Sequence, residues 1–471
     1  MSYTSVSLVH SCLLFLGVLF GGVYGGEEAL EKNGLLDQVF FTLGIGMRII
    51  MDEEWPIDPR LLRIIQGDEH FQDQIVDSLM KHSNGMFLAV SLHVNALSKC
   101  NNKNAILKVA ASLPSDLDKM YMATLERIET QNKADASLAK SALVWLTHAV
   151  RSLSTKELEH ALAAQLGSSC TIKGINDYIT PIGMVADFCC GLVIIDEKSQ
   201  MVRLAHYTVH NFFRDIALKP LSIPLSFPLS TPHTLITTSC IDYVFAVGFQ
   251  EFKVEDRSTF EALLAKEPFT EYAYNFWGHH AHSCYGENGL PDCVPKLILS
   301  TPRYPLIHIP PPAIPLLRTF EVEHLLPCHV AAYYGFLDVL SLVEDLHDGR
   351  TSLGQTALIV AVLRGHETVI QSLLLLEQTD VNAMYSNGIT ALSEASHNGH
   401  QVIVCLILSH KGFSFGVHLQ GINSFLIACT NGFGDIVKLF LTHEEIEINA
   451  IYSNGETALS IACKYGHPEI V

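Results

Sequence analysis

The chain lacks the phosphate-binding loop of ATP- and GTP-hydrolysing enzymes. That motif, Gly-x-x-x-x-Gly-Lys-[Ser/Thr], contains a Gly-Lys dipeptide, and none occurs in the 471 residues. Without the loop there are no backbone amides to cradle phosphates and no Lys to reach the γ-phosphate. We therefore expect this polypeptide to be no enzyme, to hydrolyse no ATP and to hold no cofactor.

Basic residues are also scarce. Only 30 Lys and Arg stand against 49 Asp and Glu, which gives a formal net charge of −19. Nonspecific nucleic-acid binding needs clustered positive charge, so the composition argues against that function. Hydrophobic residues make up 48% of the chain and charged residues 17%, proportions typical of a folded globular protein.

Paired cysteines and glycosylation sequons are absent as well. The twelve cysteines never form Cys-x-x-Cys, and no Asn-x-Ser/Thr occurs. Scattered cysteines are typical of small buried residues in a reducing compartment, which favours a cytoplasmic location. Residues 6–24 favour the opposite, because this apolar stretch is long enough for a secretory signal or a membrane anchor. No Lys or Arg precedes it, so residues 1–26 are a leader of that kind or an artefact of a misplaced start. The sequence alone does not decide whether residues 6–24 contact a membrane.

Residues 320–471 repeat themselves. Four glycines, spaced 34, 33 and 34 residues apart, each open a similar phrase: Gly354, Gly388, Gly421 and Gly455. Four more follow at the same spacing: Gly365, Gly399, Gly432 and Gly466. A period near 33 residues, with a Thr-x-Leu turn and two short helices separated by glycine, is the ankyrin signature. These residues closely resemble ankyrin repeats, and the resemblance implies a solenoid of stacked helical pairs that binds proteins.

The repeats depart from the family pattern in places. An earlier repeat is visible only in part, at residues 326–331, and Asn423 replaces the turn Thr in the fourth repeat. The last repeat stops at Val471 before its second helix. Because a solenoid normally ends in a polar capping repeat, we expect the chain to be truncated.

The predicted hairpin tips carry the candidate partner-binding residues. The phrase Tyr-Ser-Asn-Gly occurs twice, and Asn-Gly suits a tight turn. We assign partner binding to Tyr385, Asn387, Tyr452 and Asn454. The asparagines could merely make the turn. The tyrosines have no such structural duty, and aromatic residues anchor interfaces well.

The part before the repeats divides by pattern. We expect a linker over residues 27–67, a helical segment over 68–112, and a domain over 113–217. Leu113-Pro-Ser-Asp116 is expected to start a helix with Pro in its first turn. This domain is expected to contain several helices, followed by strands at 191–196 and 201–206 and a helix from Tyr207. Helices followed by a hairpin have the order of a winged helix. Residues 218–319 read as a helical spacer with Pro-rich linkers.

Several phrases in this part follow one another in a recognisable order: Asn84-Gly-Met-Phe-Leu88, Leu113-Pro-Ser-Asp-Leu117, Arg151-Ser-Leu-Ser154 and His206-Tyr-Thr-Val209. They resemble the region after the NTPase core of fungal NACHT proteins, STAND-type signalling ATPases that often end in ankyrin repeats. The winged helix is similar to that of GPI inositol-deacylase-like proteins. The resemblance implies a regulatory role. The family's ATP-binding core precedes this region and has no counterpart here, so one alternative is a fragment of an ATP-dependent switch.

His206 is the residue that this resemblance singles out. In related NACHT proteins a winged-helix His at a comparable place touches the phosphate of the bound nucleotide, so the resemblance implies a nucleotide contact for His206. The alternative is a His at the end of a strand that a local carbonyl satisfies.

Two further patterns suggest sites that we weigh against simpler explanations. His279, His280, His282 and Cys284 contain a spacing suited to zinc, but a second well-spaced pair is missing, so we expect no metal. Gly412-Phe-Ser-Phe-Gly416 matches a hydrolase nucleophile motif, which has meaning only at a strand–turn–helix. The repeat phase predicts a connecting finger there instead.

The sequence therefore predicts a mainly α, multidomain protein with a winged-helix region and an ankyrin solenoid. Its expected function is noncatalytic protein–protein interaction in a NACHT-like signalling protein. The alternatives are a fragment of an ATP-driven switch and a secreted or membrane-tethered ankyrin adaptor.

Overall fold

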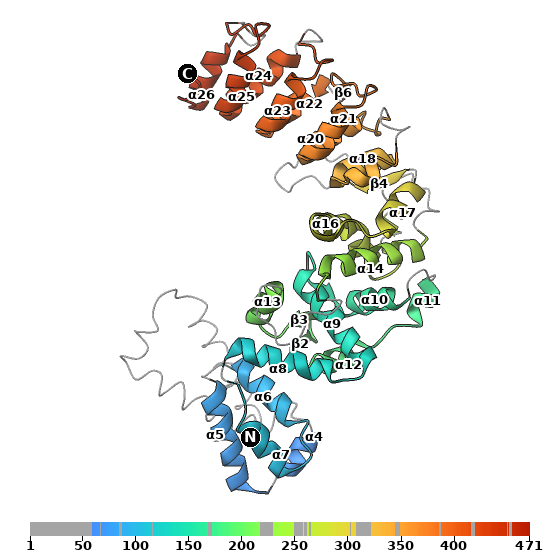
Figure 1. The fold of residues 1–471 in the computed structure, drawn as a ribbon, viewed down its shortest axis with the longest axis vertical. Helices are drawn as coiled ribbons and strands as arrows, with labels where there is room; N and C mark the ends of the chain where they lie inside the picture. The colour runs from blue at the N-terminus through green and yellow to red at the C-terminus, as the bar shows by residue number, and fades with distance from the viewer. Residues whose placement is uncertain are drawn as a thin grey trace. The chain divides into compact units, whose positions relative to one another are not determined.

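The computed structural model describes residues 59–471, apart from residues 66, 84–86, 115, 168–171, 217–228, 249–257, 259–260, 263–264, 302, 308–321, 344–348, 386–387, 416–419, 450 and 452–454. The chain forms two compact units. One runs to Thr155 and resumes over Pro181–Ser230, and the other comprises Lys156–Thr180 and Thr231–Val471. The described residues are mainly helical, as the sequence predicts (Figure 1).

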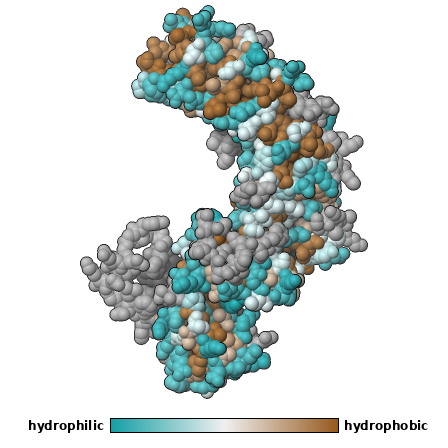
Figure 2. Space-filling view, in the orientation of Figure 1, coloured by the Kyte–Doolittle hydropathy of each residue, from teal (hydrophilic) through white to brown (hydrophobic). Residues whose placement is uncertain are grey.

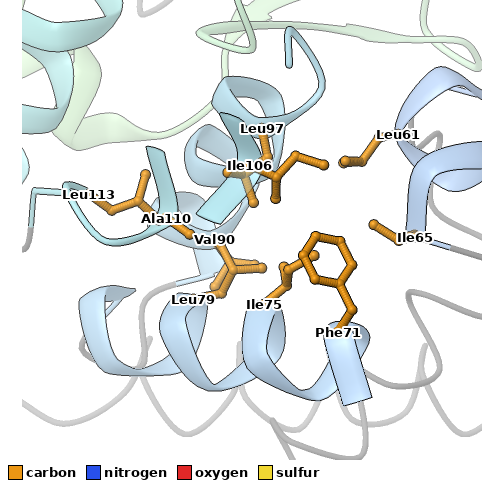
Figure 3. Close-up of a cluster of buried hydrophobic side chains, with 10 residues drawn as sticks. All are labelled: Leu61, Ile65, Phe71, Ile75, Leu79, Val90, Leu97, Ile106, Ala110 and Leu113. Atoms are coloured by element: carbon orange, nitrogen blue, oxygen red, sulfur yellow. The ribbon is translucent and has the colours of Figure 1, made fainter. Parts of the chain in front are cut away.

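The described part of the first unit begins with four helices: α4 (Pro59–Ile65), α5 (Glu69–Ser83), α6 (Phe87–Leu97) and α7 (Lys103–Ala110). Their apolar faces meet in a cluster of ten buried side chains, drawn in Figure 3. Leu61 and Ile65 are four residues apart on α4 and both belong to this cluster. The prediction of a linker through residue 67 is therefore wrong for Pro59–Ile65, because these residues form a helix that contributes to the core.

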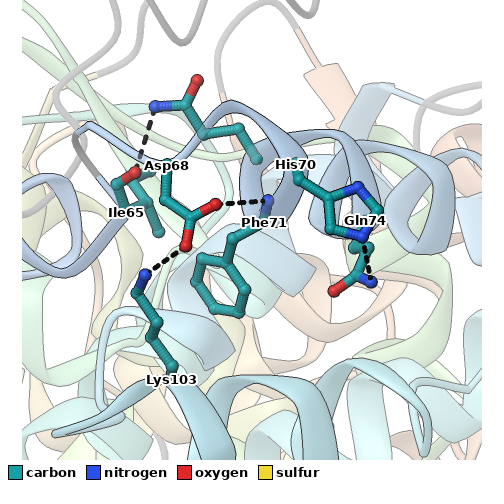
Figure 4. A network of polar contacts seen from close by, with 7 residues as sticks. Ile65, Asp68, His70, Phe71, Gln74 and Lys103 are labelled. Atoms are coloured by element: carbon teal, nitrogen blue, oxygen red, sulfur yellow. Dashed lines mark hydrogen bonds and ion pairs between the residues drawn. The ribbon is translucent and has the colours of Figure 1, made fainter.

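Asp68 fixes the start of α5 (Figure 4). One carboxylate oxygen accepts the backbone N–H of Phe71 at 3.1 Å, and the other contacts the ammonium of Lys103 at the start of α7. Both contacts favour the charged carboxylate, and the Lys103 contact is the larger cause of its lowered pKa. The side chain thus caps one helix while it contacts another.

A winged-helix arrangement follows in the first unit. Its elements are α8 (Leu117–Glu129), α9 (Lys133–His148), β1 (Leu153–Ser154), α12 (Ile182–Phe188), β2 (Val193–Asp196), β3 (Met201–Leu204) and α13 (Tyr207–Arg214). The strands form an antiparallel sheet in the order β1-β3-β2, with Val193 opposite Leu204 and Leu153 opposite Val202. Both strands expected between residues 191 and 206 are confirmed.

The start of α8 differs from the prediction. Asp116 is its N-cap and accepts the backbone N–H of Lys119 at 3.1 Å, so the helix begins at Leu117. Pro114 therefore precedes the helix instead of lying in its first turn. A carboxylate that caps the free N–H groups of a helix determines the first residue more strongly than a tolerated proline does.

The second unit opens with helices and a hairpin that precede the repeats: α10 (Thr155–Leu166), α11 (Ile172–Asn176), α14 (Pro232–Ala246), α16 (Thr270–Asn288), α17 (Cys293–Ser300), β4 (Tyr304–Ile307) and β5 (Val322–Leu325). Trp277 on α16 is fully buried, and its ring centroid lies 4.9 Å from that of Tyr334 in the first repeat. Its indole N–H donates to the Tyr304 hydroxyl at 2.7 Å. The expected spacer helix thus packs directly on the solenoid.

The repeats stack as helical pairs (Figure 1). The first helices are α18 (Pro327–Tyr334), α20 (Ala357–Arg364), α22 (Ala391–His397), α24 (Gln420–Asn431) and α26 (Ala458–Tyr465). The second helices are α19 (Leu337–Leu340), α21 (Glu367–Leu374), α23 (Gln401–Leu408) and α25 (Gly434–Leu441). Leu358 on α20 and Val369, Ile370 and Leu373 on α21 are buried, as the helical spacing predicts.

The fourth repeat begins differently from its neighbours. Thr356, Thr390 and Thr457 each cap a first helix, with the side chain accepting the N–H three residues later. Asn423 stands at this position in the fourth repeat, and α24 extends back to Gln420. Gly421 therefore lies within this helix.

Within the part of the chain that the structure describes, no helix is both long enough and apolar enough to cross a membrane. Residues 6–24, which the sequence suggests as a signal or anchor, lie outside the described residues.

Candidate functional site

A pocket of about 420 Å³ lies in the winged-helix region of the first unit. Two segments line it: the end of α9 through β1, and β3 through the first turn of α13. Four basic side chains contribute to its wall, Arg151, Arg203, His206 and His210, and no Asp or Glu does. Only the two arginines carry a fixed positive charge, and Arg203 lies 3.7 Å from the Asp196 carboxylate, so the wall is only weakly basic.

His206 occupies the junction between β3 and α13. It is the N-cap of α13, with extended backbone, and its Nδ1 accepts the backbone N–H of Thr208 at 3.3 Å. The same Nδ1 lies 2.8 Å from the Thr208 hydroxyl oxygen, which lies 2.6 Å from the Tyr121 hydroxyl on α8. An Nδ1 that accepts hydrogen bonds carries no proton, so the neutral ring holds its proton on Nε2.

Burial is consistent with this neutral form, because it lowers the pKa of His206. The alternative expected from the sequence was a local carbonyl as the partner of His206. The partners are instead a backbone N–H and a hydroxyl. A capping role thus accounts for His206 without a ligand, and its contact with a nucleotide stays a prediction. Arg151, Arg203 and His210 were not identified from the sequence, although His210 follows His206 by one helical turn.

The first hairpin tip of the ankyrin array is formed by β6 (Met384–Tyr385) and β7 (Ile389–Thr390). Tyr385 pairs with Ile389 and is half-buried, and its hydroxyl donates to the carboxylate of Glu394 on α22. The expectation that this tyrosine has no structural duty is therefore wrong, because it joins the hairpin to the following helix. Its role in partner binding stays a prediction.

The other three residues assigned to partner binding cannot be placed. Asn387, Tyr452 and Asn454 lie outside the described residues. The glycines that follow the two asparagines, Gly388 and Gly455, have φ angles of 81° and 79°, as a tight turn requires.

The histidines of α16 have separate surroundings. His279 is exposed, whereas His280 is fully buried, with its Nε2 3.0 Å from the Tyr272 hydroxyl and its Nδ1 3.0 Å from Nδ1 of His233. Nδ1 of His282 lies 2.8 Å from the backbone oxygen of Tyr334. Cys284 is buried on the same helix. No group of three metal-ligating side chains occurs among the described residues.

The Gly-x-Ser-x-Gly segment lies in a connection after α23, as the repeat phase predicts. The side chain of Asn382 brackets it: its amide donates to the Gly412 carbonyl at 2.7 Å and its oxygen accepts the Ser414 N–H at 3.1 Å. These hydrogen bonds join the connection that contains Asn382 to the corresponding connection of the next repeat. Gly416 lies outside the described residues.

Two family descriptions match parts of the chain. Residues 125–219 match the winged helix domain of GPI inositol-deacylase, and residues 328–418 and 414–471 match ankyrin repeats. The chain thus contains a winged helix of this type followed by ankyrin repeats. Both resemblances expected from the sequence are confirmed to that extent.

Curated relatives share only short regions with the chain. The probable E3 ubiquitin-protein ligase XBOS33 of Oryza sativa is 41% identical over 86 residues, which are 18% of this chain and 16% of that protein. The ankyrin repeat domain-containing protein SAT10 of Stachybotrys chartarum is 30% identical over 158 residues, or 29% of this chain and 8% of that protein. XBAT33 of Arabidopsis thaliana, an E3 ubiquitin-protein ligase, is 40% identical over 86 residues, 18% of this chain and 17% of that protein. Among solved structures, the human ASB11 ankyrin repeat domain aligns with this chain at 24% sequence identity and a TM-score of 0.28. The aligned region covers 31% of this chain and 66% of that chain.

Proposed function

We propose that the chain is a noncatalytic adaptor that binds a protein partner through its ankyrin array in the cytoplasm. The observation that carries this proposal is the array itself: helical pairs stacked on a shared core, with exposed side chains along their edges. Such surfaces are typical protein-binding sites. The ten cysteines in the described residues form no disulfide, which supports a reducing compartment.

The binding side comprises the hairpins and the first helices. His397 at the end of α22 is exposed there, and Asn431 from the next repeat donates to its backbone oxygen at 3.2 Å. Arg364 at the end of α20 lies over the Tyr333 ring at 3.8 Å. Both contacts join successive repeats and restrict the side chains of Asn431 and Arg364 before a partner binds.

Figure 2 shows that apolar surface also gathers over the repeats on the face in view. Large apolar side chains are exposed on or next to the second helices, including Leu375 at the C-cap of α21 and Val402 on α23. Single exposed apolar residues are normal on soluble proteins. They are therefore no reason to place the partner on the second helices instead of the hairpin side.

Substitutions test the binding side. Tyr385→Ala combined with Tyr452→Ala is expected to weaken capture of the partner from a source extract. Tyr385→Phe is the matched control, because it removes only the hydroxyl that contacts Glu394. Leu358→Ala opens a cavity in the shared core and should lower the free energy of unfolding by roughly 2–5 kcal/mol. Equal loss of thermal stability in the double tyrosine variant and in Leu358→Ala would place the tyrosines in the core and refute the proposed binding side.

We further propose that the winged helix is the regulatory part of a NACHT-like signalling protein. The phrases from Asn84 to His206 and the pocket without carboxylates support this proposal. The phosphate loop is absent, so the purified chain should hydrolyse no ATP above a buffer control. Turnover that disappeared on His206→Ala would contradict it. Transcript sequencing across the start codon tests the rival proposal, a switch whose ATP-binding core is encoded upstream in frame.

A further inference from the structure

Histidine rings lie between successive layers of the second unit. His366, the N-cap of α21, lies beside Gly335 of the preceding repeat: a Cβ added to this glycine would meet the His366 ring at 2.7 Å. Its Nε2 lies 3.1 Å from the Tyr333 backbone oxygen. The ring therefore donates a hydrogen bond from the second repeat to the end of the first helix of the first repeat.

A second histidine reaches the same place from the other side. Nδ1 of His282, on α16, lies 2.8 Å from the Tyr334 backbone oxygen, and its ring centroid lies 5.3 Å from that of His366. The two rings therefore clamp the C-terminal end of α18 from the helix before it and the helix pair after it. His282 is exposed, whereas His366 is half-buried.

Charged groups of both signs surround this pair. Burial is the largest cause of the lowered pKa of His366, the hydrogen bond to the Tyr333 backbone oxygen opposes it, and His282 on α16 and Arg364 on α20 lower it further. Tyr333 and Tyr334 face the pair from α18 and carry no charge near neutral pH. Of the acidic residues on the packed helices, Asp338 of α19 acts on Tyr285, and Glu367 follows His366 at the start of α21.

We propose that His366 forms a pH-sensitive joint with the His282 ring, and that protonation of His366 loosens the packing of α16 against the first two repeats. An imidazolium at His366 is disfavoured by its burial and by the positive charge of Arg364. Its ring lies against the His282 ring of α16, with the centroids 5.3 Å apart. A charged His366 ring that turns towards water therefore breaks this contact between α16 and the array.

The direction of the pH effect follows from linkage. The pKa of His366 in the folded chain lies below its ordinary value of 6.5, so the unfolded chain binds more protons in this range. Stability is fully present above pH 6.5 and is lost as pH falls below it. The joint is closed at neutral pH and opens on mild acidification.

Hydrogen–deuterium exchange of the full chain, corrected for intrinsic rates, tests the proposal at pH 7.5 and pH 5.5. Protection of α16 and α18 should fall at the lower pH, by at most about tenfold, because pH 5.5 lies one unit below the ordinary pKa of 6.5. In His282→Gln with His366→Gln the two pH values should give the same protection, because glutamine keeps a hydrogen-bond donor without the charge. The ratio between pH values stays interpretable even where a variant is less stable at both.

Two further variants separate the pair from its surroundings. His282→Gln alone should reduce the pH effect, since it removes the ring against which His366 packs. His279→Gln, an exposed position on the same helix, should leave the pH effect unchanged. A pH effect equal in the wild-type and double-variant proteins, or no effect in the wild type, would overturn the proposal.

Discussion

Trp277 is a fully buried residue that contacts several aromatic rings at the start of the solenoid. Its ring meets Tyr334 and Phe336 of the first repeat, and its N–H donates to Tyr304. Trp277→Ala should therefore lower the free energy of unfolding by roughly 3–5 kcal/mol in urea titrations followed by circular dichroism. Trp277→Phe keeps most of the apolar volume and should cost distinctly less. Similar losses in the two variants would show that the hydrogen bond, and not the packed volume, dominates.

For single residues, the sequence predicted which side chains belong to the candidate sites but not the contacts that those side chains make. The position of His206 followed from its motif, but its partner did not, because Thr208 and Tyr121 meet it only in the folded winged helix. Tyr385 was identified as a tip residue, yet its contact with Glu394 crosses from hairpin to helix. Patterns of neighbouring residues do not encode such contacts.

At the scale of elements, the repeat period predicted both helices and turns. Gly335 and Gly466 follow first helices in different repeats and have nearly the same left-handed φ, 80° and 79°. A Cβ at Gly335 would meet the His366 ring, whereas one at Gly466 would meet nothing within 4 Å. Gly466→Ala should therefore cost about 1–2 kcal/mol from backbone strain alone, and Gly335→Ala clearly more.

Urea unfolding of the two glycine variants provides the comparison. His366 cannot move aside cheaply, since its Nε2 is bonded to the Tyr333 oxygen. Equal destabilisation by the two substitutions would mean that the ring yields freely and that strain is the whole effect.

Elements with weak periodic signals were predicted less well. Helix α4 has only seven residues, and its two core side chains, Leu61 and Ile65, make too short a pattern to indicate a helix. Helix α24 extends further towards the N-terminus than the repeat phase predicts, to Gln420, and nothing in the repeat pattern indicates this extension. The first residue of α8 depends on its cap, Asp116, and not on the periodicity of its apolar residues.

At the scale of the whole molecule, the sequence predicted the order of parts better than their connections. A winged helix followed by ankyrin repeats was evident from motifs and spacing, and both regions match family descriptions. The packing of the spacer helix α16 on the array was not evident from the sequence, because it depends on Trp277 and Tyr334, which are far apart in the chain. Aromatic contacts of this kind carry no periodic signal.

The central claim is that the hairpin and first-helix side of the array binds a protein partner. Site-specific photo-crosslinking in a source extract tests it most directly, with the reactive residue at exposed His397 on α22 or at exposed Cys405 on α23 of the same repeat. We predict a crosslinked partner at His397 and none at Cys405. Crosslinks from Cys405 alone would place the partner on the second helices and contradict the account.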